Sequence, residues 1–121
     1  MKTFLAIYLG GATSPKRAEW DKLDETARQQ RAASGMKAWG DWMTTHQAAI
    51  VVEGGPLGKT KRAAVAGISD TKNNMSGYVI VNAESHEAAA KLFANHPHFT
   101  IFPGEAVEVM ECLPIPTQPK N

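Results

Sequence analysis

The C-terminal third, residues 77–115, limits the possible folds more than any other part of the chain. Residues 77–82 form an apolar run typical of a β-strand, and Ser85 then has the residue type of a helix N-cap. A short helical stretch ends at His96-Pro97-His98, and residues 105–113 predict a final strand. This order of strand, helix and strand predicts one β-α-β half of a mixed domain.

The N-terminal part of the sequence has a similar alternation. Residues 2–9 predict a first strand that ends at two glycines, and Ser14-Pro15 has the residue types favoured at a helix start. The helical pattern that follows predicts a break at Ser34-Gly35. The remaining predicted elements are helices over residues 15–33 and 36–46, strands over 50–53 and 62–68 (the latter an edge or hairpin strand), and a loop over 69–74.

The resulting order, β-α-(α)-β-β-β-α-β, predicts an α+β fold of the ferredoxin-like β-α-β-β-α-β type. With 121 residues, the chain is long enough for one hydrophobic core. We therefore expect residues 1–115 to form a single domain and residues 116–121, which contain two of the prolines, to form a C-terminal tail.

In a ferredoxin-like fold the helices cover one face of the sheet and leave the other open. We expect the open face to carry Phe4, Ala6 and Tyr8 of the first strand, with Val107 or Met110 of the last strand. Soluble monomers rarely expose an apolar patch of this kind. The sequence therefore predicts a homodimer in which the open sheet faces pack together.

Composition argues against several classes of partner. The net charge of +1 gives no general attraction to nucleic acid or to an anionic membrane. Gly58-Lys59-Thr60 resembles the end of a phosphate-binding loop, but Glu53 occupies the position of the first glycine.

The apolar run over residues 4–9 is too short for a signal peptide, and a single cysteine forms no internal disulfide, so we expect a cytoplasmic protein.

His96 and His98 are the strongest candidates for chemistry. Histidine exchanges protons near neutral pH, and two imidazoles in a His-x-His pattern supply half of a metal site. Trp39, Glu53 and Asp41 are candidate ligand-binding residues around them. We expect no organic cofactor. Two functions stay open: a small enzyme with a histidine as acid or base, and a non-catalytic module that binds a small ligand.

Several short segments resemble the YCII-related family, which includes the DGPF proteins. The matching segments are Phe4-Leu5-Ala6-Ile7-Tyr8, Gly54-Gly55-Pro56-Leu57, Gly77-Tyr78-Val79-Ile80-Val81, Ser85-His86-Glu87-Ala88, Asn95-His96-Pro97-His98, Gly104-Glu105-Ala106-Val107-Glu108-Val109 and Pro114-Ile115. They cover most of the chain in order. The resemblance implies a ferredoxin-like fold assembled as a dimeric α/β barrel.

The sequence departs from that family at the residues proposed to carry its chemistry. YCII-type members are proposed to use a helix histidine together with an aspartate. The helix position falls here near Lys37 and Ala38, and the aspartate position is occupied by His96. The Asp-Gly-Pro-Phe signature is also replaced, by Asp70-Thr71-Lys72-Asn73. The resemblance therefore implies the fold of the family without its proposed catalytic pair.

Overall fold

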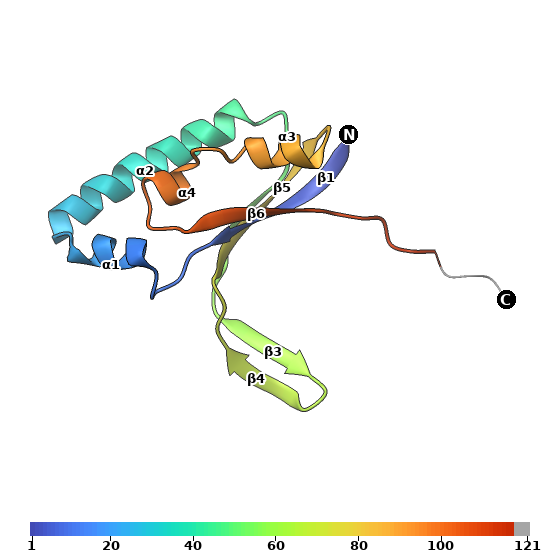
Figure 1. Ribbon diagram of the computed structural model, residues 1–121, viewed down its shortest axis with the longest axis horizontal. Helices are drawn as coiled ribbons and strands as arrows, with labels where there is room; N and C mark the ends of the chain where they lie inside the picture. Colours follow the sequence, from blue (N-terminus) through green and yellow to red (C-terminus); the bar gives the residue numbers. More distant parts are fainter. Residues whose placement is uncertain (118–121) are drawn as a thin grey trace.

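The computed structural model, shown in Figure 1, describes residues 1–117. Its main sheet has four antiparallel strands in the order β2-β5-β1-β6. The strands are β1 (Lys2–Leu9), β2 (Ile50–Pro56), β5 (Met75–Ala83) and β6 (Ala106–Glu111). The predicted tail over residues 116–121 lies, from residue 118 onward, outside the described residues.

Helices pack on one side of this sheet, as Figure 1 shows. They are α1 (Pro15–Lys22), α2 (Glu25–Thr45), α3 (His86–Lys91) and α4 (Pro97–Thr100). Ser14 and Ser85 are the N-caps of α1 and α3, as the sequence predicts, and each side chain accepts a hydrogen bond from the backbone three residues on. The architecture is α+β, and its strand order is consistent with the ferredoxin-like plan. Within residues 1–117, no helix has the length and apolar character needed to cross a membrane.

The helix-covered face of β1 is the opposite of the predicted one. Phe4, Ala6 and Tyr8 are buried under the helices, where the core also includes Trp42 of α2 and Phe93. Both faces of β1 are apolar, so hydrophobicity does not distinguish them. The helices pack against Phe4, Ala6 and Tyr8. Because side chains alternate between the two faces of a strand, the remaining side chains of β1 then point to the open face.

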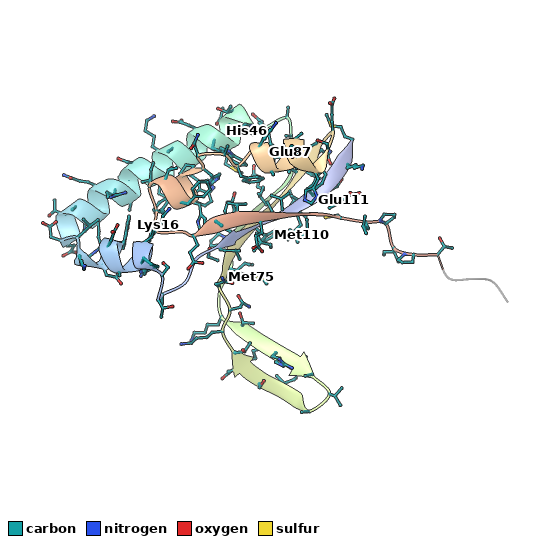
Figure 2. The ribbon with its side chains drawn as sticks, viewed as in Figure 1. Lys16, His46, Met75, Glu87, Met110 and Glu111 are labelled. Atoms are coloured by element: carbon teal, nitrogen blue, oxygen red, sulfur yellow. The ribbon has the colours of Figure 1, made fainter. Side chains whose placement is uncertain are left out.

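The open face of the sheet carries aliphatic side chains instead. Leu5 lies between Ile80 of β5 and Met110 of β6, and Ile7 pairs with Tyr78. Met110, labelled in Figure 2, is 41% exposed. The prediction of an open apolar face is therefore right, and Met110 lies there. The other residues named for it lie on the helix-covered face: Phe4, Ala6, Tyr8 and Val107.

The break between the first two helices lies eleven residues before the predicted break at Ser34-Gly35. Leu23 is extended and Asp24 caps α2, its carboxylate accepting from Ala27 N at 2.7 Å. Gly35 lies inside α2 and is buried. A Cβ at this position would overlap the ring of Phe102, so the glycine allows a close approach and does not end the helix.

This contact predicts opposite effects for two alanine substitutions in α2. Gly35→Ala is expected to lower the free energy of unfolding by about 1–3 kcal/mol, because the added methyl overpacks against Phe102. Gly40→Ala is the matched control, since its Cβ would meet no atom within 4 Å. It should raise stability by about 0.5–1 kcal/mol through helix propensity. Urea unfolding of both variants measures the difference, and stabilisation by Gly35→Ala would contradict the packing.

A two-stranded hairpin projects from the body of the molecule, as Figure 1 shows. It consists of β3 (Thr60–Ala64) and β4 (Gly67–Thr71), which form a sheet of their own. The single strand predicted over residues 62–68 is wrong, because residues 65–66 form the turn between β3 and β4, and residues 69–71 belong to β4 and not to the predicted loop. Their polar composition suits a strand whose side chains are all exposed.

Candidate functional site

A cavity of about 490 Å³ lies between α2 and the end of the sheet where β2 meets β5. Its volume suits a small organic molecule. Tyr8 comes from β1, Trp39 and Met36 come from α2, and Phe102 follows α4. The polar residues on the lining include Glu53 of β2. The cavity is therefore an aromatic-walled site with few charged groups.

Tyr8 connects the cavity to the protein interior. Its ring lies 4.8 Å from the Trp39 ring and 5.1 Å from the His96 ring, measured between centroids, and only 4% of the residue is exposed. The Tyr8 hydroxyl lies 3.5 Å from Nε2 of His96. Burial raises the pKa of the Tyr8 phenol far above its ordinary value of 10.0, so the hydroxyl is neutral at physiological pH.

His96 is fully buried beneath Tyr8 and Trp39. It is the N-cap of α4, and Pro97 at the first helical position suits the helix start. The cap bond runs from the backbone N–H of His98 to Nδ1 of His96, at 2.9 Å. His96 was predicted at the end of a helix, but it lies at the start of one. Its ring is held there by the backbone N–H of His98.

This hydrogen bond determines which nitrogen of His96 carries the proton. Nδ1 accepts from an N–H group, so the proton of the neutral ring is on Nε2, which faces the Tyr8 hydroxyl. Burial, with smaller contributions from His98 and His46, lowers the pKa of His96 from 6.5 to about 4. At neutral pH, His96 is therefore a neutral ring that donates from Nε2.

His98 is the second buried histidine. Its Nε2 donates to the backbone carbonyl of Leu9 at 2.7 Å, so this ring ties the start of α4 to the end of β1. Burial lowers the pKa of His98, Lys16 lowers it further, and the bond to Leu9 opposes both. Gly104 packs directly on the His98 ring, where a Cβ would overlap it.

The structure separates the predicted site residues into three groups. Trp39 and Glu53 line the cavity. His96 and His98 are buried behind its wall. Asp41 lies on the exposed side of α2, 3.2 Å from Lys37 Nζ, and lines none of the cavities described within residues 1–117.

Tyr8 was missed as a site residue because it was assigned to a dimer interface. A signal for it does exist in the sequence. If Phe4, Ala6 and Tyr8 form the core face of β1, the phenol is the only polar group among these three side chains, and a buried hydroxyl requires a hydrogen-bond partner.

The predicted His-x-His pair does not form part of a larger ligand cluster in the described structure. Nδ1 of His96 and Nε2 of His98 are engaged by backbone groups. Within residues 1–117, no group of three or more histidine, cysteine, aspartate or glutamate side chains is arranged to hold a metal ion.

Comparisons with known proteins give a likeness to solved structures. No family model matches the sequence, and no curated protein matches it. The structure is similar to 5-chloro-2-hydroxyhydroquinone dehydrochlorinase from Burkholderia phenoliruptrix, solved in complex with 2,5-dihydroxybenzoquinone. The TM-score is 0.49 and the identity 19%, over 89% of this chain and 90% of that chain. At these values the likeness assigns no activity to this chain.

Proposed function

We propose that this protein is a small enzyme that binds a flat, largely apolar molecule in the aromatic-walled cavity and transfers a proton on it without an organic cofactor. The observation that carries the proposal is the lining itself. Trp39, Tyr8 and Phe102 supply aromatic surface for a small ring, and Glu53 is the one acidic residue among the residues that line the same cavity. This arrangement combines a binding surface with a group able to exchange protons.

Glu53 is a better acid-base group than the histidines first predicted for this role. The His96 ring is fully buried, its Nε2 already holds a proton, and its Nδ1 is occupied by the His98 backbone. In the proposed step, the Glu53 carboxylate removes a proton from a carbon next to a carbonyl group. The C–H electron pair forms a carbon–carbon double bond, and the carbonyl π pair moves to oxygen. Return of a proton to carbon from Glu53 completes the cycle.

Deuterium exchange tests the proton transfer with a defined probe. 2-Acetylnaphthalene has an aromatic body and a methyl group that exchanges through its enolate. In D2O, the protein is expected to accelerate loss of the methyl proton signal, followed by NMR. Glu53→Gln should reduce this acceleration by about 100-fold or more, the usual contribution of a positioned acid-base group. Glu87, labelled in Figure 2, carries an exposed carboxylate on α3, and Glu87→Gln is the matched control. This variant should accelerate the exchange of the probe as much as the wild type does.

The same experiment decides between the two functions that the sequence left open. Binding of the probe with exchange no faster than in buffer would contradict the enzyme and favour a binding module. Equal acceleration by the wild type and by Glu53→Gln would show that this carboxylate is not the acid-base group.

We also propose that the protein is a homodimer through the open sheet face, and that it belongs to the YCII-related family that its motifs resemble. The strand order and the exposed aliphatic side chains of this face support both proposals. Leu5 pairs with Ile80 and Met110 across three strands, and Ile7 lies on the same face between Tyr78 and Glu108. A second copy would cover this largely apolar surface. A dimer requires a mass by light scattering of twice the 13.1 kDa chain mass.

A further inference from the structure

We propose that His96 and the His98 backbone hold Tyr8 as a hydrogen-bond donor toward the cavity, so that the substrate is a compound with an acceptor oxygen placed against the Tyr8 hydroxyl. This inference rests on the proposed function, because it names the chemical class bound in the same cavity. Tyr8 would contact the substrate, and His96 would act as a positioning residue.

The first step of the argument concerns the direction of the hydrogen bonds. The His98 backbone N–H points at Nδ1 of His96 at 2.9 Å, and a backbone N–H only donates. A proton on Nδ1 would place two donors against each other. The opposite tautomer is therefore disfavoured, and Nε2–H faces the Tyr8 oxygen.

The second step concerns the hydroxyl proton of Tyr8. The phenol oxygen accepts from His96, so its own proton is directed elsewhere. Within residues 1–117, His96 is the hydrogen-bond partner found for this hydroxyl. Tyr8 is one of the residues that line the cavity, and in the proposed complex the acceptor for its proton is a molecule bound there.

The third step concerns how rigidly this donor is held. The Tyr8 ring is enclosed by Trp39, Phe93 and the two histidines, with ring centroids between 4.8 and 6.3 Å away. His98 is in turn fixed to Leu9 at the end of β1. The 3.5 Å separation between the Tyr8 oxygen and Nε2 of His96 is long for a hydrogen bond, so the packing of the surrounding rings contributes to holding the phenol in place.

The chemical consequence is that the cavity should prefer substrates that carry a carbonyl, quinone or phenolate oxygen. In the proposed proton transfer, negative charge develops on the substrate oxygen when the carbon loses its proton. A fixed neutral donor at that oxygen stabilises the charge more than it stabilises the uncharged substrate. Molecules of the same shape without an acceptor should bind through the aromatic walls alone.

Two naphthalene probes test this preference. 2-Acetylnaphthalene carries an acceptor oxygen, and 2-ethylnaphthalene has a similar shape without one. Calorimetry measures both dissociation constants and hence their ratio. In Tyr8→Phe, we expect 2-acetylnaphthalene to lose about five- to tenfold in affinity relative to 2-ethylnaphthalene, compared with the wild type. Ser69→Ala removes an exposed hydroxyl on β4, away from this cavity, and should leave the ratio unchanged.

His96 is tested by the same ratio and by a spectroscopic signature. His96→Asn keeps a side-chain acceptor for the α4 cap, and it should shift the ratio as Tyr8→Phe does without weakening the ethyl probe. A merely structural role would weaken both probes equally. Long-range 1H–15N correlation spectra of the wild type should show His96 protonated on Nε2 and bare on Nδ1.

An unchanged ratio in Tyr8→Phe, or a His96 ring protonated on Nδ1, would overturn the inference. These outcomes differ from failure of the proposed function. If both probes bind with the expected ratio but Glu53→Gln exchanges normally, the donor assignment stands and the acid-base assignment fails. If neither probe binds, the proposed cavity function is wrong, and the substrate class inferred from it is wrong too.

Discussion

Phe4→Ala is expected to lower the free energy of unfolding by about 3–5 kcal/mol, the largest effect of any substitution considered for this protein. Phe4 is fully buried on the helix-covered face of β1, where its ring stacks on His86 at 5.4 Å between centroids. Removing the ring leaves a cavity that the surrounding strands cannot close. Urea unfolding measures the loss, and a variant that is unfolded in the absence of denaturant agrees with it.

Leu5→Glu is the matched control, one residue further on the same strand but on the opposite face. Its side chain lies between Ile80 and Met110, outside the helix-covered core. A folded protein is expected from this variant, with the mass by light scattering reduced to the 13.1 kDa of a single chain. Similar losses of stability in both variants, with no change in mass, would contradict both the assigned faces and the proposed dimer.

Stability is expected to fall as the pH is lowered from about 6.5 to 4. The unfolded chain binds a proton on His96 with the ordinary pKa of 6.5, whereas the folded protein does so only near pH 4. Between these values the unfolded state binds more protons, so acid favours unfolding. The stabilisation is fully present above pH 6.5. About 3 kcal/mol is lost by pH 4 from His96 alone, and His98, whose pKa is also lowered by burial, adds to this loss.

His96→Asn isolates the contribution of one ring, because asparagine can cap α4 without titrating in this range. The fall in unfolding free energy between pH 6.5 and 4 should be smaller in this variant than in the wild type. Since His98, His46 and Lys16 influence this region, some pH dependence should persist. Gln47→Asn, an exposed substitution that changes no titratable group, should retain the wild-type pH dependence. Parallel profiles for the wild type and His96→Asn would contradict the assigned burial of His96.

Much of the secondary structure could be predicted from the sequence because it depends on local rules. Ser14-Pro15 and Ser85 carry the capping chemistry of helix starts, and both positions are confirmed. The strands β1 and β5 follow from runs of apolar residues between turn-forming residues. An open apolar sheet face also followed from the order of these elements. Trp39 and Glu53, which the sequence predicts as ligand-binding residues, both line the cavity.

The tertiary structure decided what local rules leave undetermined. Both faces of β1 are apolar, so only the packing of α2 and α3 shows that Phe4 and Tyr8 point inward. Gly35 looks like a helix break by propensity, but its role depends on Phe102, a residue far away in the sequence.

The candidate site depends in the same way on contacts between distant parts of the chain. The sequence by itself determined that His96 lies beside a proline at a helix boundary. Only the fold brings its ring to Tyr8, 88 residues away in the sequence, and removes both from water. Burial and hydrogen-bond partners decide whether a histidine exchanges protons or acts as a neutral hydrogen-bond donor. Neither is encoded by its immediate neighbours in the sequence alone.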